Sequence, residues 1–234
     1  MDIYCSFAKM CLWVYQTVTL QHRSVRGRDR LPPGAKIVAA NHPNPTDAYH
    51  FPFVLEGKFY SLIAGTSFSL PVVGWLMTRC GQIPVHKDQK LKALDRACEL
   101  LKQGRTVLIF PEGRLNPDHL PLKVCTGAVR MSLISGAPIV PVGTYVPEHF
   151  LHTRTVQYDG RIDKRRYQVG GCCYIQIGEP WYPAREAGPQ GRAYSPRELT
   201  TILMEKIDAL AYQARREAVL DVSSNFPASP IQEK

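Results

Sequence analysis

The chain has 234 residues, of which 44% are hydrophobic, and a formal net charge of +9 at pH 7. This length and hydrophobic content allow one α/β domain, or two small ones, with a buried core, and they exclude a disordered chain. The positive charge favours an anionic partner, which can be a phosphate-bearing substrate, an acidic membrane surface or a nucleic acid.

The first predicted element is an apolar, aromatic helix within residues 1–30, and a basic segment follows it. Lys9 interrupts the apolar stretch, and no run of about 18 apolar residues occurs, so we expect no membrane-spanning helix. The basic segment contains Arg23, Arg26, Arg28 and Arg30. An apolar helix beside arginines can lie in a membrane interface with the arginines on lipid phosphates, and we favour this over a core-docking helix with a solvated basic loop.

Strands and helices are predicted to alternate after this segment. Five stretches with the character of buried strands cover residues 36–41, 59–65, 106–113, 138–146 and 172–180. Helices are predicted at 90–104, at 126–137 and after Ser195, where Ser195 and Glu198 can form a capping box. The alternation predicts an α/β fold, with a mostly parallel central sheet flanked by helices, in one domain at residues 31–220. Residues 221–234 are predicted to be a disordered tail.

Two polar motifs follow predicted strands, and both are candidates for a functional site. Asn41 and His42 follow the first of these strands, and the sequence Pro-Glu-Gly at 111–113 ends the third. In α/β proteins with parallel sheets, active groups lie in loops at the carboxyl ends of the strands. We therefore predict that the two motifs share one site.

Asp47 follows His42 with four residues between them, in the sequence HPNPTD. A neutral histidine can take a proton from an alcohol, and a carboxylate on its other ring nitrogen fixes the tautomer and stabilises the imidazolium. The alternative is a structural Asp47 in the first turn of a helix that begins at Asn44 and Pro45. The two side chains can meet only if His42 lies in the preceding turn and folds back over the helix start, which the two prolines favour.

Four sequence blocks occur in order along the chain: NHPNPTD at 41–47, GWLMTRCGQIPVHKD at 74–88, FPEGRLN at 110–116 and APIVPVG at 137–143. Together they resemble the glycerolipid acyltransferase family of the lysophosphatidate acyltransferase type, which carries an Asn-His-x4-Asp motif. The resemblance implies an interfacial α/β enzyme, usually at the cytoplasmic face of a membrane. It also implies transfer of a fatty acyl group from a thioester, of coenzyme A or acyl carrier protein, to the hydroxyl of a lysolipid.

The resemblance also implies roles for individual residues. His42 matches the general base of the family, and Asp47 matches its partner carboxylate. Glu112 and Gly113 match the block that helps to bind the phosphate of the acceptor. Arg114 can offer paired donors to phosphate oxygens. The predicted catalytic residues are therefore His42 and Asp47.

Two departures from the family pattern concern the acceptor. The second block of the family often ends in an arginine, and Lys87 stands at the matching position here. The third block commonly reads Phe-Pro-Glu-Gly-Thr-Arg, whereas in this chain Arg114 follows Gly113 directly. A lysine ammonium group is a compact point charge, whereas an arginine guanidinium group can donate two parallel hydrogen bonds, so the geometry of phosphate binding changes. An alternative for the third block is a structural ion pair between Glu112 and Arg114. The predicted substrate-binding residues are Asn41, Lys87, Glu112, Gly113 and Arg114.

The predicted function is an O-acyltransferase for a lysophospholipid, first of all 1-acylglycerol-3-phosphate, with acyl-CoA or acyl carrier protein as co-substrate donor and no metal or redox cofactor. Lysophosphatidylethanolamine, another aminolipid and glycerol phosphate are alternative acceptors. A thioesterase or lipase, which the lack of G-x-S-x-G disfavours, and a non-catalytic membrane-binding module are alternative functions. No nucleic-acid-binding module is indicated. We predict a peripheral or monotopic protein on the cytoplasmic side of a membrane, with its oligomeric state left open.

Overall fold

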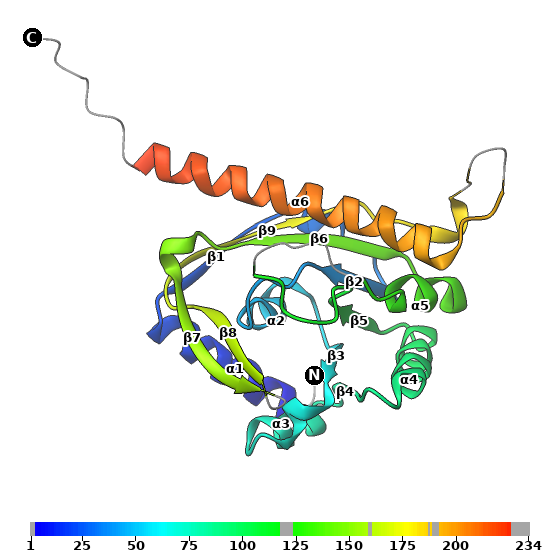
Figure 1. The fold of residues 1–234 in the computed structure, drawn as a ribbon, viewed down its shortest axis with the longest axis horizontal. Helices are drawn as coiled ribbons and strands as arrows, with labels where there is room; N and C mark the ends of the chain where they lie inside the picture. The colour runs from blue at the N-terminus through cyan, green and yellow to red at the C-terminus, as the bar shows by residue number, and fades with distance from the viewer. Residues whose placement is uncertain (1–2, 118–123, 159–160, 187, 189–191, 226–234) are drawn as a thin grey trace, which may run out of the picture.

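The computed structural model describes residues 3–117, 124–158, 161–186, 188 and 192–225, and it places a seven-stranded sheet among helices (Figure 1). The strands of this sheet are β1 (Gln21–Arg26), β2 (Lys36–Ala40), β3 (Phe59–Ala64), β4 (Ile83–Val85), β5 (Thr106–Ile109), β6 (Ile139–Tyr145) and β9 (Gly171–Ile177). The helices are α1 (Ile3–Val18), α2 (Phe51–Val54), α3 (Val73–Arg79), α4 (Lys90–Lys102), α5 (Gly127–Ser135) and α6 (Pro196–Asn225). Short 3-10 helices are η1 (Arg28–Arg30), η2 (Asp47–Tyr49), η3 (Gly65–Ser69), η4 (Glu148–Phe150) and η5 (Pro183–Arg185). A separate hairpin joins β7 (Leu151–Tyr158) to β8 (Arg161–Gln168).

The central sheet is mostly parallel, as the alternation of strands and helices predicted. The strand order is β1-β9-β6-β2-β5-β3-β4, in which β6, β2, β5, β3 and β4 run in one direction. β9 is antiparallel to β6, and β1 pairs with β9 in parallel. The basic segment after the first helix therefore forms an edge strand that its arginine-rich sequence did not predict, because pairing with β9 overrides the weak strand propensity.

The side chains of the central strands alternate between two buried layers. Ile37 and Ala39 of β2 belong to a cluster with residues of α4, α5 and α6. Val38 and Ala40 belong to a second cluster, which includes Phe51 of α2. Figure 1 shows α6 and α2 on opposite sides of β6 and β9. A strand buried on both faces reads as a continuous apolar run, which is why β2 could be recognised in the sequence.

The helix α6 begins with the predicted capping box. The backbone N–H of Ser195 donates to Oε2 of Glu198 at 2.8 Å, and the backbone N–H of Glu198 donates to Oγ of Ser195 at 3.3 Å. These reciprocal bonds satisfy two N–H groups that have no partner within the helix. Gly143 of β6 lets α6 lie directly on the sheet, since a Cβ atom there would be 2.1 Å from the backbone nitrogen of Ala211.

The disordered tail was predicted to begin too early. α6 continues to Asn225, so residues 221–225 are helical. The hydroxyl of Tyr174 in β9 donates to the carboxylate of Asp221 at 3.0 Å, which ties this end of the helix to the sheet. Residues 226–234 lie outside the described part of the chain.

Candidate active site

The loops that follow β2 and β5 lie side by side, because these strands are parallel neighbours in the sheet. The backbone N–H of His42 donates to Oε1 of Glu112 at 3.0 Å. The backbone carbonyl of His42 accepts the N–H of Asn116 at 2.9 Å. Both backbone polar groups of His42 are thus held by the loop that follows β5. The two polar motifs meet at the carboxyl edge of the sheet, as the sequence predicted.

His42 and Asp47 approach each other within the loop after β2. The Nδ1 atom of His42 lies 3.6 Å from Oδ2 of Asp47, and the two side chains are 19% and 1% exposed. This distance allows an ion pair but exceeds the length of about 2.7–3.2 Å of an N–H···O hydrogen bond. Catalytic hydrogen bonds often reach their short length only in the complex with substrate. The fold-back of His42 that the sequence required is therefore present.

The predicted helix start at Asn44 and Pro45 is wrong. Residues 43–46 form a loop and turn, and η2 begins only at Asp47. The carboxylate of Asp47 accepts the N–H of Asn44 at 2.7 Å, which closes the turn. Pro52 has no N–H to donate to the carbonyl four residues earlier, so a continuous α-helix cannot extend through this segment. Asp47 both closes the turn and faces His42, so its structural and catalytic interpretations are compatible.

Stacking on an aromatic ring orients the imidazole of His42. The ring of Phe110, the residue directly after β5, lies 4.0 Å from the His42 ring between centroids, at an interplanar angle of 17°. Phe110 in turn contacts Phe51 edge to face, with the ring centroids 6.1 Å apart. The sequence did not indicate a role for Phe110, because its contact with His42 depends on the pairing of β2 with β5.

Asn41, predicted to bind substrate, anchors the end of β2 in the structure. Its side chain is 2% exposed and bonds the end of β2 to β6. The amide nitrogen of Asn41 donates to the carbonyl of Thr144, and the amide oxygen accepts both the N–H and the hydroxyl of Thr144. Because the amide is buried and bonded on both sides, Asn41 positions the loop, and its contact with substrate stays a prediction.

Glu112 is a buried acid whose carboxylate supports the backbone of His42. The residue is 6% exposed. Burial raises the pKa of the Glu112 carboxyl, and the hydrogen bond from the His42 N–H acts in the opposite direction. Within the described residues no ion pair joins Glu112 to Arg114, so the structural ion pair considered for this block is not observed.

The other predicted substrate-binding residues follow the carboxyl ends of β5 and β4, two strands that β3 separates in the sheet. Gly113 has a φ of +66° and lies where a Cβ atom would be 2.9 Å from Sγ of Cys125, so the turn after Glu112 favours glycine. Arg114 is exposed directly after this turn. Lys87 follows β4, which is three strands away from β2 in the sheet. At about 4.8 Å per strand, Lys87 lies roughly 14 Å from the end of β2 along the sheet edge.

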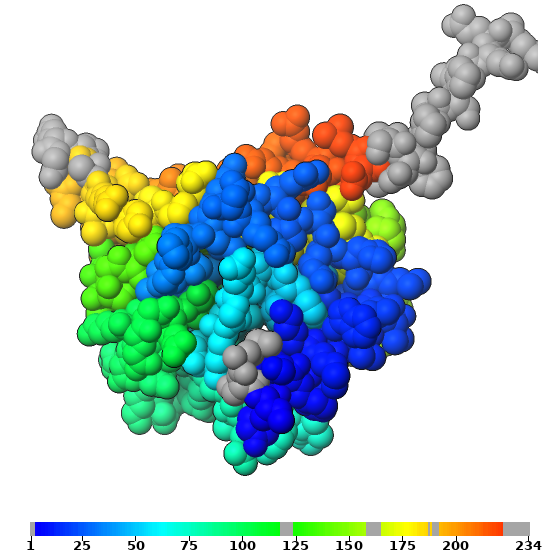
Figure 2. Space-filling view, turned by 180° about the vertical axis from the view of Figure 1, so that it is seen from behind, coloured from blue at the N-terminus to red at the C-terminus, as the bar shows by residue number. Residues whose placement is uncertain are grey.

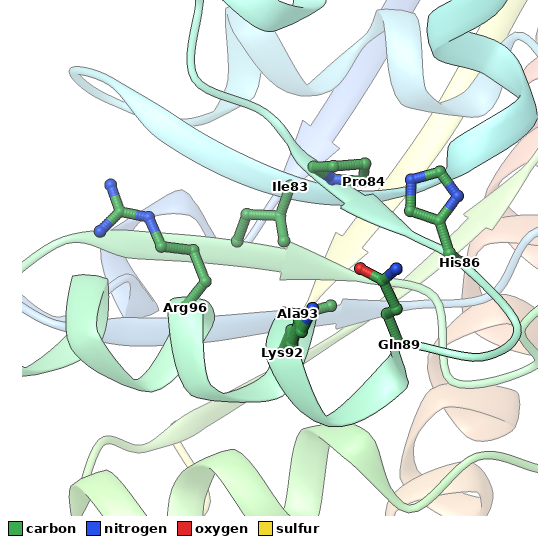
Figure 3. Close-up of a pocket in the computed structure, with 7 residues that line it drawn as sticks. All are labelled: Ile83, Pro84, His86, Gln89, Lys92, Ala93 and Arg96. Atoms are coloured by element: carbon green, nitrogen blue, oxygen red, sulfur yellow. The ribbon is translucent and has the colours of Figure 1, made fainter.

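A cleft of about 260 Å³ lies between β4 and α4 (Figure 3). His86 and Gln89, which flank the loop that carries Lys87, are at one end of the cleft, and Arg96 is at the other. Neither His42 nor Asp47 lines this cleft. The candidate catalytic pair therefore lies outside it, on the face of the sheet that α2 covers.

His50, for which the sequence indicated no role, is completely buried and joins α1 to the end of β8. Nε2 of Gln16 is 3.2 Å from Nδ1 of His50, and Nε2 of His50 is 2.8 Å from Oε1 of Gln168. Oε1 of Gln16 accepts a hydrogen bond from Arg23, and Nε2 of Gln168 donates to two backbone carbonyls. These directions require a neutral His50 that carries its proton on Nε2.

This buried link supports the turn that contains Asp47. The N–H of His50 donates to the carbonyl of Asp47 at 3.2 Å, and the N–H of Gln168 donates to Oγ1 of Thr46 at 3.2 Å. Gln16 is the buried residue of α1, so the same link fixes that helix. The partners of His50 are 34 and 118 positions away in the chain, which is why no local pattern indicated them.

The sequence profile of the family described as Acyltransferase matches residues 22–145. A 1-acyl-sn-glycerol-3-phosphate acyltransferase of Chlamydomonas reinhardtii is 31% identical over 124 residues, which cover 51% of this chain and 37% of that protein. A protein of the same name from Pseudomonas aeruginosa is 25% identical over 166 residues, which cover 68% of this chain and 62% of that protein. The matched part thus spans little more than a third of the Chlamydomonas protein.

A solved structure shares the fold. The structure titled as the 1-acyl-sn-glycerophosphate acyltransferase PlsC of Thermotoga maritima superposes with a TM-score of 0.63, over 88% of this chain and 79% of that chain. The sequence identity is 19%. The likeness therefore supports the α/β fold.

We predict that the stability of the protein falls on acidification because of His50. Burial lowers the pKa of His50 below its ordinary value near 6.5, against the opposing effects of Gln168 and Asp47, while Arg23 lowers it further. The contribution of neutral His50 to the free energy of unfolding is complete above that value. It is lost as the pH falls below it, at up to about 1.4 kcal/mol per pH unit, because the unfolded state then binds a proton that the folded state does not. Urea unfolding at several pH values between about 5 and 7.5 measures this loss of stability.

The control is His50→Asn, whose side-chain oxygen replaces the Nδ1 acceptor for Gln16 and does not titrate. Glu112 is present in both proteins, so its own titration cancels in the comparison. The wild-type protein should lose more stability than the variant below pH 6.5, a value near the ordinary pKa of histidine. Equal losses in the two proteins would rule out His50 as the cause.

Proposed function

The chain belongs to the Acyltransferase family, and on this premise we propose that it transfers a fatty acyl group from an acyl thioester to the free hydroxyl of a lysophospholipid. The observation that carries the proposal is the 3.6 Å approach of His42 to Asp47 in a loop that the buried Glu112 holds in place. A base with an oriented carboxylate partner is the arrangement that proton transfer from a hydroxyl requires.

In the proposed reaction, Nδ1 of His42 carries a proton toward Asp47, which leaves Nε2 to accept the proton of the substrate hydroxyl. The hydroxyl oxygen attacks the thioester carbonyl and forms a tetrahedral intermediate. The carbon–sulfur bond then breaks, and the departing thiolate takes the proton from His42, so the base is regenerated. Asp47 stabilises the imidazolium between these steps. Proton transfer and thioester cleavage need no metal or redox group, so we propose none.

We propose 1-acylglycerol-3-phosphate as the acceptor, because the two relatives described above are named for that substrate. Arg114 is exposed beside Glu112, and a guanidinium group can donate two parallel hydrogen bonds to a phosphate. Lys87 lies farther along the same edge of the sheet, so it would add positive potential to a headgroup that extends in that direction. The acyl donor in this proposal is acyl-CoA or acyl carrier protein.

We also propose that the protein works on the cytoplasmic face of a membrane. Within the described residues, no helix has the length and apolar character to cross a bilayer. Figure 2 shows α1 in dark blue beside the blue-green α3 segment, and the rings of Tyr4 and Trp75 contact each other with centroids 5.6 Å apart. The large apolar side chains exposed on α1 and within residues 70–75 are Ile3, Phe7, Met10, Trp13, Val14, Tyr15, Val18, Leu70, Val72, Val73 and Trp75. A cluster of exposed apolar side chains marks a contact surface, and we assign it to the lipid interface.

The reaction is tested with purified protein, one labelled acyl thioester and a panel of acceptors. We expect acylation of 1-acylglycerol-3-phosphate above the other lysophospholipids and above glycerol phosphate. His42→Ala should reduce turnover by at least about 10²- to 10⁴-fold, because the proton acceptor is lost. Its free energy of unfolding should stay close to that of the wild-type protein.

The matched control is His152→Ala, since His152 is an exposed histidine on β7, and this variant should keep full activity. Release of free fatty acid at an undiminished rate without any acceptor would favour the thioesterase alternative instead. Wild-type turnover by His42→Ala would refute the proposed mechanism.

A second prediction concerns the exposed face of α1. The double variant Phe7→Ser and Val14→Ser removes two apolar side chains that lie seven residues apart on one face of the helix. Partition onto phospholipid vesicles should fall about tenfold or more, because each lost side chain removes buried apolar area in the bound state. Vesicle sedimentation measures the partition.

Leu91→Ser is the control, because Leu91 is a similarly exposed apolar residue on α4. It should bind vesicles as well as the wild-type protein does. Equal binding by all three proteins would show that α1 does not contact the lipid. These point variants are preferable to removal of the helix, because Gln16 of α1 is hydrogen-bonded to His50 in the core.

A further inference from the structure

The four arginines of the basic segment divide into two pairs. Nε of Arg26 lies 3.2 Å from Oε1 of Glu217, and Nε of Arg30 lies 3.0 Å from Oε1 of Glu179. In the part of the chain that the structure describes, Arg23 and Arg28 form no ion pair with a carboxylate. The first pair is therefore compensated within the protein, and the second pair carries uncompensated charge.

The uncompensated arginines converge with Lys9 on one aromatic residue, Phe53 of α2. The guanidinium carbon of Arg23 lies 4.3 Å from the centroid of the Phe53 ring, and Nζ of Lys9 lies 5.5 Å from it. A guanidinium nitrogen of Arg28 donates to the carbonyl of Phe53 at 2.9 Å. Lys9 also lacks an ion pair with any described carboxylate. Three cations from α1, β1 and η1 thus surround one residue with no acidic side chain to balance them.

This arrangement is unfavourable without an anion. Burial lowers the pKa of Arg23, and the charge of the nearby Arg28 lowers it further; the guanidinium still stays charged at neutral pH. The interaction with the Phe53 ring offsets part of the cost of holding these cations together. A bound phosphate would offset the rest by accepting hydrogen bonds from the two guanidinium groups and the ammonium group.

A cleft beside this cluster links it to the exposed face of α1. The cleft has a volume of about 450 Å³, and Arg23 and His22 line it together with Trp13 and Leu20. The side chains of Trp13 and Leu20 are 57% and 69% exposed. Within the described residues, the guanidinium of Arg23 makes one hydrogen bond, to Oε1 of Gln16 at 2.8 Å. One of the three cations, Arg23, therefore lies next to an apolar rim.

We propose that Lys9, Arg23 and Arg28 form a binding site for the phosphate group of an anionic bilayer lipid, separate from the acceptor site at Arg114. The apolar rim favours a lipid over a free phosphate, because Trp13 and Leu20 can contact acyl chains while the cations hold the headgroup. This proposal rests on the membrane association proposed above. α2 follows the turn of Asp47 in the chain, so a lipid at Phe53 would hold this end of the site at the membrane surface.

The test compares two double variants that remove the same charge from the same segment. Arg23→Gln with Arg28→Gln removes the uncompensated pair, and Arg26→Gln with Arg30→Gln removes the compensated pair. Binding to vesicles of phosphatidylcholine, with and without phosphatidylglycerol, is measured by sedimentation. We expect the first variant to lose about tenfold or more in affinity for the anionic vesicles and the second to lose less than about threefold. Equal losses would overturn the proposal, because they would indicate attraction by net charge alone.

Two further arms complete the experiment. The double variant Lys9→Gln with Arg28→Gln leaves Arg23 packed on Phe53 and Gln16. A loss of vesicle binding by this variant therefore cannot be attributed to misfolding around Arg23. Vesicle binding equal to that of the wild-type protein would contradict the proposed site. Inorganic phosphate is titrated without vesicles; saturable binding that the first double variant abolishes, with no preference for anionic vesicles, would assign the site to a soluble phosphate and overturn the lipid assignment. His42→Ala should bind vesicles as the wild-type protein does, because His42 is not part of the lipid site. The vesicle experiment therefore tests the lipid site even if the protein proves not to transfer acyl groups.

Discussion

One hydrogen bond sets the geometry of the candidate site, namely the bond from the backbone N–H of His42 to the buried carboxylate of Glu112. It joins the loops that follow two central strands, and the return bond from Asn116 to the His42 carbonyl closes the connection. Burying a carboxyl group is costly unless the group is hydrogen-bonded, and the raised pKa of Glu112 reflects that cost. The glutamate of the Pro-Glu-Gly sequence thus acts on His42 through the backbone, in addition to any contact with a ligand.

Local patterns in the sequence were sufficient for much of the fold. The apolar runs of β2 and β5, the capping box at Ser195 and the placement of two polar motifs after strands all depend on neighbouring residues. The helix predicted at Asn44 failed even though a local signal against it, Pro52, was present in the sequence. The site itself required long-range information: Asn41 is bonded to Thr144, which is 103 positions away. Its role as an anchor could not be predicted from its place next to His42.

The positively charged side chains of the chain differ in their surroundings in the structure. A charge count treats the arginines of the basic segment as equivalent, but Glu179 and Glu217, far along the chain, compensate only Arg30 and Arg26. Arg23 has a further structural contact, because it orients the amide of Gln16 that bonds to His50. The apolar face of α1, the cationic cluster and the turn that carries Asp47 are therefore connected through a short series of contacts. In the proposed function, this connection links the membrane-facing helix to the turn that carries Asp47.

In the proposed mechanism, Asp47 holds the imidazole of His42 in the tautomer that leaves Nε2 free to accept a proton. Nitrogen-15 NMR of the His42 ring, at a pH where the ring is neutral, reports which ring nitrogen carries the proton. We expect a ring protonated on Nδ1 in the wild-type protein and a shift of the proton toward Nε2 in Asp47→Asn. A wild-type ring protonated on Nε2, or a spectrum that Asp47→Asn leaves unchanged, would contradict it.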